Sequence, residues 1–226
     1  LSHVSERAAD RYRLVQLYRA LLLPECAGIQ AQRPVERLLF TADKDPRLIE
    51  YLPLLRAAFP ESHVIHIVRD PRDVLLSKQS AAWSRHRHWR ANLAAGRFQL
   101  DLGDCYAAEC YGWRYHVLRY EELIAEPEQT LRRLMHSLDI DFKEEMLSFS
   151  EAAARLTSSS DQEWKRETSG PLLATNSGKW REGLSDKQLR TTETAFAGHM
   201  LRYGYRRACA SRIRTLPLRL LLSAAS

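Results

Sequence analysis

Short β-branched runs alternate along this chain with longer amphipathic stretches. Residues 64–68 (VIHIV) form such a run and predict a strand buried on both faces, and residues 38–40 (LLF) predict a second strand. An Asp-Pro pair follows each run, at positions 70–71 and 45–46. Aspartate caps free helix amides and proline fits the first helical turn, so each pair predicts the start of a helix. Such strand–helix units predict an α/β fold with a mostly parallel sheet flanked by helices.

The same rules predict the remaining elements. They predict an amphipathic helix over 5–23, a strand that turns at an acidic pair over 115–123, a helix from Pro127, a short helix over 144–154, a turn over 176–180, and a capped helix from Ser185 to about Gly204. We interpret the stretches 84–102 and 156–171 as loops, the first of them beginning with the cationic sequence SRHRHWR.

Basic residues stand at both predicted strand ends. Arg69 and Lys44 each precede an Asp-Pro helix start, and they would share one rim if the strands are parallel neighbours. That rim favours anions, because helix N-termini present free amides there. Ser77 lies about 10 Å along the helix from its cap, so a ligand that touches Arg69 and Ser77 would lie beside the first two turns. The competing interpretation is that Arg69 and Arg72 only pair with neighbouring aspartates and that the repeat is coincidence.

Length and charge limit the choice of function. The 226 residues suffice for one large domain with a substantial core, and the net charge is +6. Six arginines and no acid lie in residues 202–226, and removing these six from the 34 basic residues leaves 28 against 28 acidic residues. The neutral body gives no support for a nucleic-acid-binding protein. The basic tail could make a weak membrane contact, but a frayed terminus is the interpretation that we favour.

Cysteine and hydropathy patterns point to an ordinary intracellular globular protein. The four cysteines form neither a CxxC pair nor a disulfide framework, which favours a reducing compartment, and we therefore expect a cytoplasmic location. No apolar run is long enough to span a membrane, so no transmembrane segment is predicted. His86 and His88 lack a neighbouring carboxylate or cysteine, so no metal site is expected.

Five motifs occur in a characteristic order. They are KDPRLIEYLPLLRAAFP (44–60), VIHIVRDPRDVLLSK (64–78), VLRYEEL (117–123), SGKW (177–180) and LRYGY (201–205). In order and spacing they resemble the sulfotransferases that use 3′-phosphoadenosine 5′-phosphosulfate (PAPS), and the resemblance spans roughly residues 38–207. It is closer to the tyrosylprotein and bacterial branches than to the cytosolic small-molecule enzymes. An ordered set of five is far more specific than any one motif.

The resemblance implies roles for five residues. Arg69 and Ser77 would hold the 3′-phosphate of PAPS, and Tyr120 would lie beside the adenine. Lys179 would lie on a loop that folds over the nucleotide. Lys44 would be catalytic, stabilising negative charge on the transferring sulfuryl group, a role that suits a fixed ammonium. No metal is implied.

The chain also departs from the family pattern. The family's fold is a P-loop-like parallel sheet that opens with a strand and a Pro-x-Ser-Gly-Thr phosphate loop, and no such stretch occurs here. Position 81 is Ala81 where the tyrosylprotein branch has an arginine, and no general base can be assigned. The chain also lacks the G-x-x-x-x-G-K-[ST] loop of P-loop kinases, which argues against a kinase relative.

We therefore expect a sulfotransferase domain over 1–207, incomplete at its N-terminus with the first strand and phosphate loop missing, and a basic tail over 208–226. Its expected reaction is sulfuryl transfer to a hydroxyl or amine of a small-molecule, saccharide or protein acceptor, with little activity in this chain alone. Acceptor choice would depend on loops such as 84–102. The alternative is a non-catalytic nucleotide- or partner-binding remnant of the fold.

Overall fold

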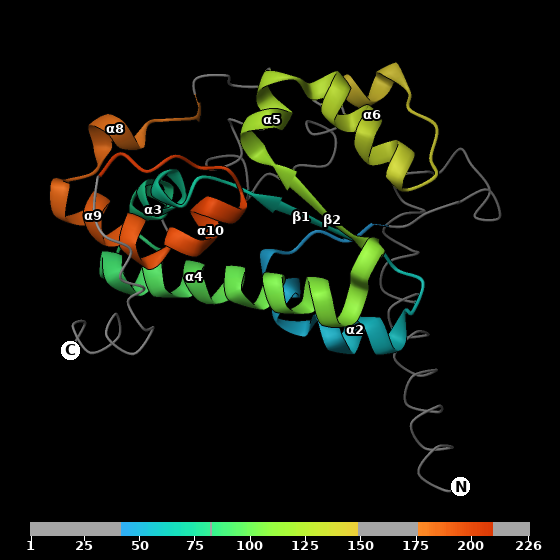
Figure 1. Ribbon diagram of the computed structural model, residues 1–226, viewed down its shortest axis with the longest axis horizontal. Helices are drawn as coiled ribbons and strands as arrows, with labels where there is room; N and C mark the ends of the chain where they lie inside the picture. The colour runs from blue at the N-terminus through green and yellow to red at the C-terminus, as the bar shows by residue number, and fades with distance from the viewer. Residues whose placement is uncertain (1–41, 82, 149–175, 210–226) are drawn as a thin grey trace, which may run out of the picture. The chain divides into compact units, whose positions relative to one another are not determined.

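The structure is a computed structural model of the 226-residue chain, and it describes residues 42–81, 83–148 and 176–209 (Figure 1). The described residues fall into two compact units. Residues 42–64 and 102–114 form the first, and residues 65–81, 83–101, 115–148 and 176–209 form the second. The strand predicted over 38–40, the helix over 5–23, the loop over 156–171 and the tail from residue 210 lie outside the described residues.

The first unit is mostly helical. Its elements are the 3₁₀-helix η2 (Pro46–Tyr51), α2 (Leu52–Ala58), the π-helical η3 (Ala107–Tyr111) and the 3₁₀-helix η4 (Gly112–Arg114). The predicted cap is confirmed, because the Asp45 side chain accepts from the Arg47 amide at 2.7 Å. The Tyr111 hydroxyl donates to the Leu52 carbonyl at 3.2 Å and so joins η3 to the start of α2.

The predicted strands β1 (Val64–Val68) and β2 (Tyr115–Arg119) are confirmed, and they form a parallel pair (Figure 1). The expectation that the first of them is buried on both faces is wrong. Ile65 and Ile67 are 45% and 53% exposed, whereas Val68 is buried. This alternation is typical of a strand covered on one face only.

Helices make up most of the second unit. They are α3 (Pro71–Ser80), α4 (Trp89–Tyr106, which ends in the first unit), α5 (Tyr120–Ala125), α6 (Pro127–Ser137), the 3₁₀-helix η5 (Glu144–Leu147), α8 (Trp180–Gly183), α9 (Asp186–Ala195) and α10 (Ala197–Arg202). None of the helices in the described ranges is long and apolar enough to cross a membrane. The helix predicted from Pro127 is confirmed, and the predicted helix over 144–154 is described only as the single turn of η5.

The core of the second unit lies among α3, α4, α9 and α10. Its buried members are Leu75, Leu93, Ala94, Ala195, Phe196, Met200 and Tyr205. Two predictions are wrong here. The stretch 84–102, predicted as a loop, is helical from Trp89 onward, and α4 places Leu93 and Ala94 in this core. The helix predicted from Ser185 to Gly204 is broken at Phe196, whose backbone leaves the helical region and whose ring is buried.

Candidate functional site

Arg69 occupies the turn between the end of β1 and the start of α3. The predicted cap is confirmed here too, because Asp70 Oδ1 accepts from the Arg72 amide at 2.9 Å and Pro71 begins the helix. The Asp70 amide donates to Glu121 Oε1 at 2.9 Å, just beyond β2. The two strand ends of the second unit are therefore tied together at the turn that carries Arg69.

Arg69 meets two residues that are distant in sequence. Its Nη2 donates to the Asn176 carbonyl at 2.6 Å, and its guanidinium carbon lies 4.8 Å from the centre of the Tyr120 ring. Asn176 Nδ2 in turn donates to the Tyr120 hydroxyl at 2.9 Å. The structure thus brings together two of the predicted cofactor-binding residues, Arg69 and Tyr120, around an asparagine that the sequence did not single out.

The Arg69 guanidinium retains unused donor capacity. Its Nε is buried and has no hydrogen-bond partner among the described residues. Its contacts in that part of the chain go to Asn176 and Tyr120, and none of them is to a carboxylate. A buried, partnerless N–H of a cation is costly unless a ligand supplies an acceptor. The residues around Arg69 therefore fit an anionic group such as a phosphate.

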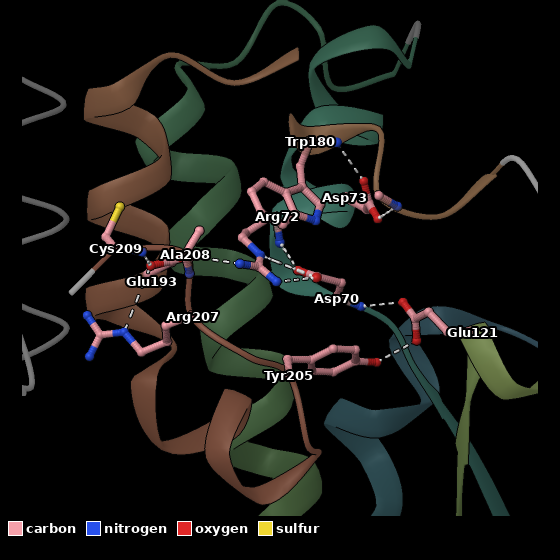
Figure 2. A network of polar contacts seen from close by, with 11 residues as sticks. Asp70, Arg72, Asp73, Glu121, Trp180, Glu193, Tyr205, Arg207, Ala208 and Cys209 are labelled. Carbon is pink, nitrogen blue, oxygen red and sulfur yellow. Dashed lines mark hydrogen bonds and ion pairs between the residues drawn. The ribbon is translucent and has the colours of Figure 1, made fainter. Parts of the chain in front are cut away.

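The turn that carries Lys179 is fixed by Asp73 of α3. The Gly178 amide donates to Asp73 Oδ2 at 2.7 Å and the Trp180 amide donates to Asp73 Oδ1 at 2.9 Å (Figure 2). Gly178 has a φ of +79°, a left-handed backbone that favours glycine. Lys179 lies between the two bonded amides, and its side chain is exposed. The predicted turn over 176–180 is confirmed.

Arg72 is the centre of a buried ionic network (Figure 2). Its Nε and Nη2 donate to the Asp70 carboxylate at 2.9 and 2.7 Å, and its Nη1 donates to Glu193 Oε1 at 2.7 Å. The guanidinium carbon also lies 3.7 Å from the centre of the buried Trp180 ring. The competing interpretation from the sequence is thus right for Arg72, which pairs with Asp70, whereas Arg69 binds elsewhere.

Glu193 is fully buried yet stays charged. Burial would raise its pKa, but hydrogen bonds from the Ala208 and Cys209 amides, at 2.7 and 2.8 Å, and from Arg72 outweigh that effect and hold the pKa below its ordinary value. These bonds attach the segment after α10 to the network around Arg72. Residues 208 and 209, expected to begin the tail, are therefore held by backbone hydrogen bonds.

The other predicted site residues are less tightly constrained. Ser77 lies on α3 with an exposed side chain, seven residues beyond the Asp70 cap. Lys44 is exposed and belongs to the first unit, so its expected place beside Arg69 stays a prediction. Within the described ranges there is no cluster of three or more His, Cys, Asp or Glu side chains that could hold a metal ion.

Sequence reasoning missed Asn176 and Asp73. An Asn-Ser-Gly turn was visible over 176–178, but nothing in it pointed to Arg69, because the contact spans 107 residues. Asp73 stood in the Asp-Pro-Arg-Asp run and was considered only as a partner for arginine. Its backbone partners can be recognised only once the 176–180 turn is placed beside α3.

A capped helix that follows a parallel strand pair is the arrangement of an α/β protein. At this strand end the buried Arg69 Nε, which has no partner among the described residues, fits an anionic ligand. The comparisons with known proteins agree with this class. The model of the Sulfotransferase family matches residues 4–144, more than half of the chain, and the chain therefore belongs to that family.

Individual relatives agree with this assignment. The chain is 24% identical over 160 residues to "Putative protein-tyrosine sulfotransferase" of Caenorhabditis briggsae, covering 66% of this chain and 54% of that protein. It is 28% identical over 184 residues to "Carbohydrate sulfotransferase 3" of Rattus norvegicus, covering 72% of this chain and 38% of that protein. The chain thus spans about half or less of the length of these curated relatives.

A solved structure supports the fold. "Sulfotransferase Domain from the Curacin Biosynthetic Pathway" matches with a TM-score of 0.52 and 16% identity, covering 73% of this chain and 62% of that one. This likeness confirms the expected α/β fold of the sulfotransferase, P-loop-like type.

Proposed function

We propose that this chain contributes the nucleotide-binding rim of a sulfotransferase that uses PAPS. The observation that carries the proposal is the Arg69 guanidinium, held at a strand end by Asn176 and Tyr120 with a buried Nε that has no partner in the described ranges. A phosphate offers several acceptor oxygens to such a guanidinium, and charge-assisted bonds of this kind are strong. Membership of the Sulfotransferase family supports the same choice of co-substrate.

Four residues would hold the nucleotide and one would act on the transferring group. Arg69 and Ser77 bind the 3′-phosphate, Tyr120 lies beside the adenine, and Lys179 reaches the nucleotide from its exposed turn. Lys44 places a positive charge near the transferring group. When bound, PAPS supplies the sulfuryl group: a bond forms from the acceptor oxygen or nitrogen to sulfur, the sulfur–oxygen bond to the phosphate breaks, and the acceptor's proton passes to solvent.

The acceptor is a hydroxyl or amine of a saccharide, protein or small molecule. The names of the relatives support saccharide and protein acceptors, because one is a protein-tyrosine sulfotransferase by name and another a carbohydrate sulfotransferase.

The 226 residues alone should transfer sulfate slowly. They contain no Pro-x-Ser-Gly-Thr stretch, the family's cradle for the 5′-phosphosulfate. Removal of one preorganised donor costs about 10²–10³ in rate, and a whole loop supplies several donors. This absence also favours a second candidate function, a non-catalytic nucleotide- or partner-binding module. An assay of sulfate transfer from labelled PAPS to phenols, peptides and saccharides distinguishes the two. Slow transfer above the rate without protein supports the sulfotransferase, and no transfer above that rate supports the non-catalytic module.

Calorimetry tests the nucleotide assignment. Adenosine 3′,5′-bisphosphate should bind the chain more tightly than 5′-AMP, because only the former carries the 3′-phosphate for Arg69. Arg69→Ala should weaken the binding of adenosine 3′,5′-bisphosphate by about 1.5–3 kcal/mol, the usual contribution of hydrogen bonds to a charged group. Arg132→Ala, on the exposed face of α6, is the matched control and should bind normally. Equal binding of the two nucleotides would contradict the assignment.

A further inference from the structure

The geometry points to Asp73 as a positioning residue that fixes Lys179 relative to Arg69. The inference rests on the proposed function, because it concerns how the two cations come to face one nucleotide. Asp73 does not itself meet the ligand. It acts through the 176–180 turn, which joins Arg69 at its first residue and α8 at its last.

Both oxygens of Asp73 are committed to that turn. Asp73 is 2% exposed, and its carboxylate accepts hydrogen bonds from the amides of Gly178 and Trp180 at 2.7 and 2.9 Å. A buried carboxylate is strongly destabilised unless such bonds satisfy it, so this pairing is hard to break. Lys179 lies between the two donors, and its Cα is therefore held against the first turn of α3.

Two further contacts hold the same turn at its ends. At its start, the Asn176 carbonyl accepts from Arg69, and at its end the Trp180 ring lies against the Arg72 guanidinium. Arg69, Arg72 and Asp73 belong to one short segment of five residues. The segment that carries Arg69 thus also anchors the turn that carries Lys179.

This arrangement affects affinity through preorganisation. The Lys179 side chain is exposed, whereas the backbone on either side of it is restrained by the two amides bonded to Asp73. A ligand that binds Arg69 and Lys179 together then avoids the entropy cost of ordering the turn. Without Asp73 the turn loses two of its anchors, and the ligand must supply that ordering.

Calorimetry with adenosine 3′,5′-bisphosphate tests the inference on the full 226-residue chain. Asp73→Asn keeps the size of the side chain but turns an NH₂ group toward an amide donor, so at least one bond is lost. We expect the dissociation constant to rise roughly tenfold to a hundredfold, the equivalent of a charged hydrogen bond. Glu128→Gln, an exposed carboxylate on α6, is the matched control and should change nothing.

A double-mutant cycle separates positioning from a general loss of structure. In a Lys179→Ala chain, Asp73→Asn should weaken binding by less than about twofold, because the lysine that it positions is gone. The same fold-loss with and without Lys179 would overturn the inference and leave a purely structural role. If the unmodified chain does not prefer adenosine 3′,5′-bisphosphate over 5′-AMP, the proposed function is wrong. The positioning role, which rests on that function, is then wrong as well.

Gly178→Ala gives an independent test that leaves Asp73 intact. A Cβ at this position would meet only Arg181 Nε at an ordinary 3.8 Å, so the change acts through the left-handed φ of +79°. This variant should weaken nucleotide binding in the same direction, again by less when Lys179 is alanine. Wild-type affinity in both Asp73→Asn and Gly178→Ala would show that the turn does not position Lys179.

Discussion

The Tyr205 hydroxyl donates a 2.7 Å hydrogen bond to Glu121 Oε2, although the two residues are 84 positions apart (Figure 2). The other oxygen of the same carboxylate accepts the Asp70 amide at 2.9 Å. Glu121 therefore links the segment after α10 to the turn that carries Arg69. The last tyrosine of the LRYGY motif therefore has a structural role, because its bond to Glu121 stabilises the turn that carries Arg69.

Tyr205→Phe should lower the free energy of unfolding by about 1–2 kcal/mol at neutral pH, because Glu121 loses one of its donors. It should also change the response to alkali. Burial, together with the neighbouring Glu121 carboxylate, raises the pKa of Tyr205 far above its ordinary value of about 10. The unfolded chain then loses this proton first, so the stabilisation is complete below about pH 10 and declines as the pH rises further.

Urea unfolding from about pH 8 to pH 11 measures both effects. The wild-type midpoint should fall more steeply above pH 10 than that of Tyr205→Phe. Tyr51 is 49% exposed, so Tyr51→Phe is the control and should follow the wild type. Parallel curves for wild type and Tyr205→Phe would show that the Tyr205 phenol is not held in its neutral form.

Glu193→Gln should be among the most destabilising conservative changes in the second unit. The carboxylate is fully buried and binds Arg72 Nη1 at 2.7 Å, so neutralising it leaves a buried guanidinium with only Asp70 as its counter-charge. Loss of one partner of a buried pair typically costs about 3–5 kcal/mol. Denaturant unfolding measures this loss, and Glu128→Gln on α6 should change stability by less than about 0.5 kcal/mol.

Acid unfolding gives a second measure of the same group. Because its surroundings hold the pKa of Glu193 below the ordinary value, the stabilisation is present above about pH 4.3 and is lost as the pH falls through the folded-state pKa. The wild type should therefore lose more stability than Glu193→Gln between about pH 5 and pH 3. If Glu193→Gln lowered the free energy of unfolding by less than about 1 kcal/mol at neutral pH, water would have to reach the Arg72–Glu193 pair.

Local signals in the sequence were sufficient for the elements next to the site. The Asp-Pro starts at Asp45 and Asp70 and the strand over Val64–Val68 are found as predicted, because caps and short apolar runs are decided within a few residues. The break at Phe196 was not predictable, since helical propensity continues through it and the ring's burial in the core decides the outcome. The loop predicted over 84–102 is helical from Trp89 onward, because packing of Leu93 and Ala94 in the core, and not the local cationic sequence, decides the structure there.

The sequence predicts only part of the candidate site. Family resemblance predicts a cofactor-binding role for Arg69, Ser77, Tyr120 and Lys179, but the contacts that fix Arg69 and the Lys179 turn in place are tertiary. Asn176 accepts from the Arg69 side chain through its own carbonyl, and Asp73 accepts from the Gly178 and Trp180 amides. Each contact spans more than 100 positions, and no local pattern encodes such a partner. The relation of Lys44 to these residues stays a prediction, because it lies in the other unit.

Two deletions of the C-terminal segment, which differ only in residues 208 and 209, should have different effects on stability. Deleting residues 210–226 should change the free energy of unfolding by less than about 0.5 kcal/mol, because that sequence has no acids and no long apolar periodicity with which to pack. Deleting residues 208–226 instead removes the Ala208 and Cys209 amides that bind Glu193. Two bonds to a buried charge are lost, so this shorter chain should be less stable by at least about 1.5 kcal/mol.

Thermal and denaturant unfolding of the two truncated chains would decide this point. A third chain that ends at residue 212 places the new terminal carboxylate three residues further from Cys209, and it controls for repulsion of Glu193 by that carboxylate. In a Glu193→Gln background the two deletions should differ much less, because the neutral side chain holds the amides weakly. A drop of several degrees on deleting 210–226 alone would show that the tail contributes to the fold, and equal stability of all three chains would show that the bonds to Glu193 contribute nothing.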